Sequence, residues 1–517
     1  MKATILATLF STLAYSTPEE PQYPSGRIIT TQNAQVTRFP ANGAQNVNPD
    51  THLVLTFPSP PKIGNSGTIK IYDAASKQLV ETLDLKIASS PNPSGRAPGN
   101  KGTTTAPGPA SASDKGKYQE TIIGGYDFHF FPIIVRENIA TINLHNGALK
   151  YGKTYTVKID PSILSPPVEG VAGEDAWTFT TKASPPSQES KQVVVSADGT
   201  GDFSTLQGAI DWAPATPSKK MTILVKNGWY EEIIFASKKS NLIIRGESRE
   251  GVKVGYPNNS AFNPAKAGPS RRPAFTLNEC KDIQLSTFTI ENYFIGQAEA
   301  LLVKGQRIII DRMTLIGSGD AFTTYGTTYF VDSKLSGHGD TVLGYGAVFF
   351  LRSVIESIGP FTWTRTVSGS HGNILVNSTL VGLGKPLPWT VTDANPRGQV
   401  PKAVFARLPG NGPRKDQNFP NAEMVLVNTK MSGVPPEGWG PVQSSGFDTK
   451  NVHFWEYNSM DGSGRAVDIS KRAAIGKVLT MPKDAKTIEE YSRPEFVLGG
   501  WKPVVVGGGG GGGVDES

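Results

Sequence analysis

The sequence contains almost no cysteine and no long apolar run. Cys280 is the single cysteine among 517 residues, so an intrachain disulfide and a zinc site built from several cysteines are excluded. Its position at the start of a strand-like segment is typical of a small buried side chain rather than of a nucleophile. After the N-terminal segment, no run of 18 consecutive apolar residues occurs, so we expect no membrane-spanning helix.

An excess of one charge is missing as well. The 51 basic and 45 acidic residues leave a net charge of only +6, and no long run of Lys and Arg occurs. We therefore expect neither nucleic acid nor a membrane as a partner. Apolar residues make up 38% of the chain, which excludes a wholly disordered protein, and the 56 Gly and 39 Pro favour turn-rich β structure.

The two ends of the chain differ from the rest in composition. Residues 1–16 combine a lysine, an apolar run too short to cross a bilayer, and a small-x-small motif, which is typical of a secretory signal peptide. We therefore expect a secreted, extracellular protein. Residues 504–517 include seven consecutive glycines and are predicted to be a disordered tail.

Residues 27–182 are predicted to form a β-sandwich domain. Short segments in which apolar and polar residues alternate are divided by turn residues, and no long helical pattern interrupts them. The segments FPANGAQNVNPDTHLVLTF and LKYGKTYTVKI resemble Ig-like modules of bacterial type. Residues 183–190, ASPPSQES, have the composition of a linker. We expect residues 191–503 to fold and function without the first domain, because all candidate catalytic residues follow this linker.

Residues 191–503 contain a repeat. Segments such as STFTI, DRMTL and VDSKL end in an apolar residue, at steps of 25, 20, 20, 25 and 51 residues; these residues are Ile290, Leu315, Leu335, Ile355, Leu380 and Met431. Such a period predicts a solenoid, and a right-handed parallel β-helix fits better than leucine-rich repeats. The last step allows an insertion or a skipped rung. Asn377 and Asn428 are predicted to stack inside the coil, and a helix over residues 206–213 to cap it.

The pattern GxGD occurs twice and ends at Asp320 and Asp340, 20 residues apart. Equivalent positions on successive rungs of a β-helix are separated by about 4.8 Å, so the two carboxylates are predicted to be neighbours. One of two adjacent carboxylates tends to keep its proton, which would give a neutral acid beside a charged nucleophile. The spacing alone leaves a second interpretation open, in which the repeat copies an ordinary turn.

Five ordered segments carry a resemblance to a known family. ADGTGDFSTLQGAI (197–210), NGWYEE (227–232), GQAEALLV (296–303), GDAFTTYG (319–326) and GDTVLGYG (339–346) resemble successive motifs of the pectin methylesterases. The resemblance spans roughly residues 190–500. It implies a right-handed parallel β-helix that hydrolyses the methyl esters of homogalacturonan, with neither a metal nor another cofactor.

The resemblance also assigns roles to individual residues. It implies that Asp340 is the nucleophile, that Asp320 is the acid/base group, and that Gln297 stabilises the oxyanion. The arginine of the family corresponds most closely to Arg407, displaced by one position, and Arg365 is the alternative partner for Asp340. A second glutamine of the family is replaced by Gly319.

Further aromatic residues are candidates for sugar contacts. The tryptophan that follows the family's arginine is Gly410 here, so Trp363, Trp439, Tyr345 and Trp389 are the predicted substrate-binding residues. We expect a monomer that acts on pectin. Two alternatives stay open: a retaining or polygalacturonase-like glycoside hydrolase, since GHG at 337–339 is similar to a motif of that family, and a non-catalytic pectin-binding β-helix.

Overall fold

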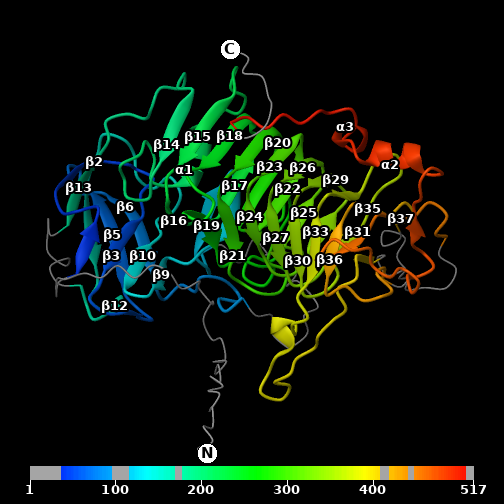
Figure 1. Cartoon of the computed structure of the whole chain (residues 1–517). Coiled ribbons are helices and arrows are strands. Elements are labelled where there is room, and N and C mark those ends of the chain that lie inside the picture. Colours follow the sequence, from blue (N-terminus) through cyan, green and yellow to red (C-terminus); the bar gives the residue numbers. More distant parts are fainter. Residues whose placement is uncertain (1–35, 96–115, 169–176, 408–418, 441–447, 508–517) are drawn as a thin grey trace, which may run out of the picture.

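The computed structural model of the protein describes residues 36–95, 116–168, 177–407, 419–440 and 448–507. The expected signal peptide and most of the predicted tail lie outside these ranges. Figure 1 shows a block of blue and cyan strands that leads into a long coil of green, yellow and orange strands. Within the described ranges, no helix is both long and apolar enough to cross a membrane.

The first domain consists of two sheets that share one apolar core. Along β5, Ile69 and Ile71 alternate with half-buried residues, because successive side chains of a strand point to opposite faces. All pairings within the two sheets are antiparallel except that of β13 with β2. The sheets form the predicted sandwich, whereas its kinship with Ig-like modules stays a prediction.

The sheets of this domain have the orders β1 (Thr37–Phe39), β3 (Leu53–Thr56), β10 (Ile139–Ile142), β9 (Ile133–Arg136) and β2 (Ala44–Val47), β13 (Thr178–Thr181), β11 (Thr154–Ile159), β5 (Thr68–Asp73), β6 (Leu79–Asp84). Two short pairs accompany them: β4 (Lys62–Ile63) with β12 (Leu164–Ser165), and β7 (Glu120–Ile123) with β8 (Tyr126–His129).

The second region is a parallel β-helix. One wall is a nine-stranded sheet of β16 (Gly228–Glu231), β19 (Val252–Tyr256), β21 (Thr289–Asn292), β24 (Thr314–Ile316), β27 (Lys334–Gly337), β30 (Val354–Ser357), β33 (Thr379–Gly382), β36 (Lys430–Ser432) and β38 (Met460–Asp461). A 17-stranded sheet supplies the other walls, and all its pairings are parallel. Its strands are β14 (Gln192–Val195), β15 (Met221–Val225), β17 (Ile234–Ser237), β18 (Ser240–Gly246), β20 (Phe275–Ser286), β22 (Leu301–Gln306), β23 (Ile308–Asp311), β25 (Phe322–Thr324), β26 (Thr327–Val331), β28 (Val342–Gly344), β29 (Ala347–Leu351), β31 (Thr362–Thr364), β32 (Asn373–Val376), β34 (Ala406–Arg407), β35 (Glu423–Val427), β37 (His453–Tyr457) and β39 (Lys477–Val478).

The register of the nine-stranded sheet confirms the predicted repeat. Its Cα partners run through the six apolar residues of the repeat, Ile290, Leu315, Leu335, Ile355, Leu380 and Met431. Because Leu380 pairs directly with Met431, the step of 51 residues is an insertion and not a skipped rung. The inserted chain carries β34, whose Arg407 pairs with Trp363 of the rung below.

The two asparagines at the corners of the coil do not lie where the sequence predicts. Asn377 and Asn428 have φ angles of 49° and 51°, in the left-handed region that Asn tolerates, and they lie on the outside of the turn. The stacked ladder inside the coil is formed by the hydroxyl groups of the following residues. Ser333 accepts a hydrogen bond from the backbone N–H of Met313 (2.8 Å), and Ser353 from that of Ser333 (3.2 Å). Amide stacking inside the coil was therefore a wrong prediction.

Helices cover parts of the coil. The predicted cap is present as α1 (Leu206–Trp212), which buries Leu206 and Ile210 against the first rungs. Glu232 of the GWYEE motif accepts hydrogen bonds from two backbone N–H groups at the start of α1, so its role is structural. Near the other end, α2 (Ala485–Tyr491) and α3 (Pro494–Val497) pack on the outside of the coil, with the short helix η2 (Pro388–Thr390) in the insertion.

The two domains share a closely packed interface. Phe131 of the first domain stacks on Phe262 of the coil at 4.5 Å between ring centroids. Arg136 donates two hydrogen bonds to Glu231, of 2.8 and 2.6 Å, and its guanidinium lies 4.1 Å from the ring centroid of Trp229. The apolar core of the sandwich continues into the coil through four buried aromatic residues, Phe235, Tyr256, Phe262 and Phe294. This continuity argues against the expectation that residues 191–503 fold without the first domain.

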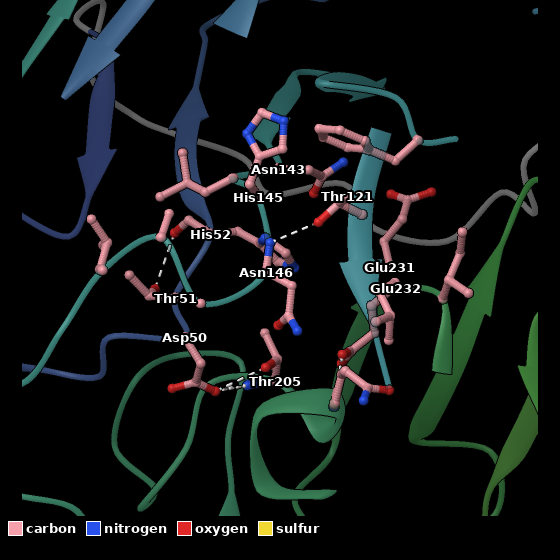
Figure 2. A pocket seen from close by; sticks show the side chains of 18 of the residues that line it. Asp50, Thr51, His52, Thr121, Asn143, His145, Asn146, Thr205, Glu231 and Glu232 are labelled. Carbon is pink, nitrogen blue, oxygen red and sulfur yellow. Dashed lines mark hydrogen bonds between the residues drawn. The ribbon is translucent and has the colours of Figure 1, made fainter. Parts of the chain in front are cut away.

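A small cavity of about 80 Å³ lies inside this interface. Figure 2 shows its lining, with Asp50 of the first domain hydrogen-bonded to Thr205, the residue that caps α1. His52 is half-buried beside the cavity, and desolvation of its imidazole lowers the pKa to about 4. Polar side chains from both domains therefore meet at the start of the coil.

We expect a truncated chain that begins at residue 191 to lose stability and to aggregate. Removal of the sandwich would expose the four aromatic side chains that the interface buries, and each such side chain contributes roughly 1.5–3 kcal/mol when buried. Thermal melts and light scattering of this chain, beside a chain that begins at residue 36, would test the expectation. A soluble truncated protein that melts cooperatively near the temperature of the longer one would contradict it.

Candidate active site

The two aspartates lie on neighbouring rungs. Isolated parallel bridges join Gln297 to Gly319 and Gly319 to Gly339, so three successive rungs are in register. Asp320 and Asp340 directly follow the last two of these positions and have φ angles of 59° and 46°. Asp tolerates this left-handed conformation better than most residues. The predicted neighbourhood of the two carboxylates is therefore present, at the edge of strands β25 and β28.

Asp320 is in an environment that favours its protonated form. The residue is 6% exposed. Burial raises the pKa of its carboxyl to about 7, against the opposing effect of Arg272, and the charges of Glu299 and Asp340 raise it further. A carboxyl with this pKa can both give and take a proton near neutral pH.

Asp340 has a cationic partner. Arg407 donates from Nε to Oδ1 at 2.7 Å and from Nη2 to Oδ2. Its guanidinium also lies 4.3 Å from the ring centroid of Trp363, its Cα partner in the sheet. The expected contact of Arg407 with Asp340 is thus made from β34, while Leu408 and Gly410 lie outside the described residues. Arg365, the alternative partner, lies over the ring of Trp363 at 3.6 Å.

Gln297 precedes β22 and is half-buried beside Asp320. Its Oε1 accepts a hydrogen bond of 2.8 Å from Nη1 of Arg272. Its amide nitrogen has no hydrogen-bond partner among the described residues, so this end of the side chain is available to a ligand. Sequence reasoning missed Arg272 and Glu299, which lie beneath this group. The signal was a lone acidic residue within the segment QAEALLV, in which Gln297 is the only other polar residue.

The four predicted aromatic contacts have different environments. Tyr345 lies between Tyr325 and Phe419, with ring centroids 5.8 and 5.5 Å away. Trp363 is half-buried under the two guanidinium groups, and Trp389 lies on η2 with its ring centroid 6.2 Å from that of His338. Trp439 is a correction: it is 1% exposed and stacks on Phe454 in the core, so it cannot contact a polymer.

His338 is a structural residue of the second GxGD segment. Its Nδ1 shares a hydrogen bond of 2.8 Å with the hydroxyl of Ser318, which occupies the same position one rung earlier. Burial lowers the pKa of the imidazole to about 4, so the ring is neutral at neutral pH. These contacts give the histidine a structural role in the turn.

A comparison with family models decides the family. The model described as Pectinesterase matches residues 192–500, which is more than half of the chain. The chain belongs to the pectinesterase family. The match begins at β14 and ends just after α3, so it includes every rung of the coil and both GxGD segments.

The individual pectinesterases that match the chain have low sequence identity to it. Pectinesterase/pectinesterase inhibitor 18 of Arabidopsis thaliana is 24% identical over 315 residues, which are 60% of this chain and 53% of that protein. The chain thus spans about half the length of this relative. The solved pectin methylesterase of Erwinia chrysanthemi is 25% identical, with a TM-score of 0.47, over 60% of this chain and 98% of that one. The carrot enzyme is 18% identical, with a TM-score of 0.45, over 60% and 93%.

We expect Asp320→Asn to stabilise the protein at alkaline pH. The folded state raises the pKa of this carboxyl from 3.8 to about 7, so the wild type loses stability as the pH rises through this interval and Asn does not. The gain should be on the order of 1–3 kcal/mol above pH 7 and should vanish near pH 4. Thermal melts at pH 4 and pH 8.5 measure it, and an equal difference at both would contradict the assignment.

Proposed function

We propose that the protein is a secreted pectinesterase that hydrolyses the methyl esters of homogalacturonan to pectate and methanol, with Asp340 as the nucleophile. The observation that carries this proposal is the unequal environment of two neighbouring carboxylates. Asp340 accepts paired hydrogen bonds from a guanidinium that orient its carboxylate, whereas burial keeps a proton on Asp320 up to about neutral pH. Membership of the pectinesterase family supports the same reaction.

In the first half of the reaction, a carboxylate oxygen of Asp340 attacks the ester carbonyl carbon. The carbonyl oxygen becomes an oxyanion, and the free amide nitrogen of Gln297 donates a hydrogen bond to it. The bond from the carbonyl carbon to the methoxy oxygen then breaks, and Asp320 transfers its proton to this oxygen. Methanol leaves, and the uronate is bound to Asp340 as an acyl anhydride.

In the second half of the reaction, water displaces Asp340 from the acyl group. Asp320, now a carboxylate, takes one proton of the water while the oxygen attacks the acyl carbon. The bond to Asp340 breaks, and Asp340 leaves as a carboxylate. The product is a galacturonic acid unit that loses its proton to solvent, and Asp320 is protonated again for the next cycle.

Pectin is the proposed substrate, and the aromatic residues beside the aspartates support a sugar polymer. Tyr325, 40% exposed, and Tyr345 stack on successive rungs next to the GxGD segments. Exposed aromatic faces of this kind bind sugar rings through apolar contact. Secretion, as proposed from the residues at the start of the chain, would bring the enzyme to the cell wall, where this substrate occurs.

Asp340→Asn should lower methanol release from highly methylated pectin by about a thousandfold or more, because an amide cannot act as the carboxylate nucleophile. Asp332→Asn is the matched control, since Asp332 has a φ of 48° and two hydrogen bonds from an arginine, but lies on the outer surface of the coil. Near wild-type release by folded Asp340→Asn would refute the nucleophile. In the wild-type protein, release of reducing ends in place of methanol would indicate the glycosidase, and release of neither would indicate the binding protein.

Arg407→Ala should lower turnover by about a hundredfold or more, because the paired hydrogen bonds orient Asp340 for attack. Arg407→Lys should recover only part of the loss, since an ammonium cannot form the planar fork. Steady-state methanol release measures both variants. Arg352→Ala is the control, because it breaks an equivalent pair with Asp332 on the surface. An unchanged rate in Arg407→Ala would exclude the pairing from catalysis.

A further inference from the structure

The residue directly before Asp320 cannot supply a hydrogen-bond donor to the site. Gly319 has no side chain, and a Cβ atom built there would lie 2.8 Å from the carbonyl oxygen of Gly296 on the rung below. This distance is too short for a real contact, and the obstructing atom belongs to the backbone. Larger residues are therefore excluded from position 319 unless the rungs move apart. A further side chain that contacts Gln297 or Asp320 must come from a neighbouring segment.

Arg272 reaches this region from the segment between β19 and β20. Its Nε donates to Oε1 of Glu299 at 2.6 Å, its Nη1 donates to Oε1 of Gln297 at 2.8 Å, and its Nη2 lies 3.4 Å from Oδ2 of Asp320. One planar group thus contacts three side chains of the site. Among side chains, only a guanidinium presents several donors in such a fixed fork.

Glu299 is the anchor of this arrangement. It is 0% exposed, and its Oε2 has no hydrogen-bond partner among the described residues. A buried carboxylate that is only half satisfied is costly, and a structural core would be more stable with an apolar side chain at this position. Its one strong contact is with Arg272, so holding this guanidinium under the site is the role that the geometry leaves for it.

We propose that Arg272, anchored by Glu299, is a positioning residue that aims the amide nitrogen of Gln297 at the reacting carbonyl and controls the acid/base carboxyl of Asp320. This inference rests on the proposed esterase function. Because the guanidinium donates to Oε1 of Gln297, a flipped amide would set two donors against each other, so the NH₂ group faces the substrate. No contact of Arg272 with substrate is needed for this role.

The second part of the role is electrostatic. The charged groups that face Asp320 are Arg272, Glu299, Asp340, Arg365 and Arg407. Arg272 opposes the effect of burial on the pKa of Asp320, and Glu299 acts in the other direction. Glu299→Gln removes a negative charge with almost no change of shape, so Asp320 should lose its proton at lower pH and the basic limb of the pH–rate profile should move down.

The experiment compares Arg272→Lys and Glu299→Gln in the full chain with pectin as substrate. Arg272→Lys keeps the charge but not the fork, so kcat should fall about tenfold or more while KM changes little. Arg271→Lys is the matched control. Arg271 lies next to Arg272 in the chain but pairs with Asp127 of the first domain, and among the described residues it has no ion pair with Asp320 or Asp340. Wild-type kcat in Arg272→Lys together with an unmoved profile in Glu299→Gln would overturn the proposal.

A substrate-free measurement separates this inference from the proposed function. The ¹³C carboxyl signal of Asp320, assigned with Asp320→Asn, can be titrated in the wild type and in Glu299→Gln. A lower midpoint in the variant supports the control of Asp320 by this pair even if the wild type releases no methanol, which would refute the esterase alone. An unchanged midpoint overturns the control of Asp320 even if methanol is released.

Discussion

The pairing of parallel strands from one rung to the next is the constraint on which the site depends. Gly319 and Gly339 are Cα partners, so the residue after each is forced into the same corner of the coil. Neither aspartate has to be brought to the other by a flexible loop. The same register brings Arg407 over Trp363 and next to Asp340. Chemistry that needs two carboxylates side by side therefore follows from the spacing of a sheet.

Charge compensation is the second constraint. Three carboxyl groups, of Asp320, Asp340 and Glu299, are gathered with the guanidinium groups of Arg272 and Arg407. Asp320 and Glu299 are buried, whereas Asp340 and both arginines are partly exposed. Arg272 pairs mainly with Glu299 and Arg407 with Asp340. The charge of Asp320 is therefore the least compensated of the three. Burial first, and this division of charges second, raises the pKa of Asp320, as the proposed acid/base role requires.

Much of this could be predicted from the sequence, because a β-helix repeats its pattern along the chain. The apolar residue that closes each repeat fixed the register from Ile290 to Met431, and the 20-residue spacing placed the aspartates together. The orientation of the corners could not be predicted in this way. Asn is a residue type that can stack inside a coil, but the left-handed backbone at Asn377 turns its side chain outward. The following residue, Ser378, lies inside instead.

Contacts between segments far apart in sequence were also beyond prediction. Trp439 is as plausible a sugar platform as Trp389 until packing buries it against Phe454. Arg272 belongs to no repeat, and only the fold shows that it passes beneath Gln297. The interface with the first domain could not be predicted for the same reason. The composition of residues 183–190 gives no information about the aromatic side chains that the two domains contribute to it.

The insertion between Leu380 and Met431 has a consequence for how this architecture can change over evolution. The two residues remain direct partners although 50 residues separate them, so the coil closes its rung whatever the length of the excursion. Mutations that lengthen, shorten or replace the part of the insertion that precedes β34, where η2 and Trp389 lie, can remodel the surroundings of the site while Arg407 stays paired with Asp340. Selectivity for one polymer over another can thus diverge within a lineage while the reaction centre is inherited unaltered.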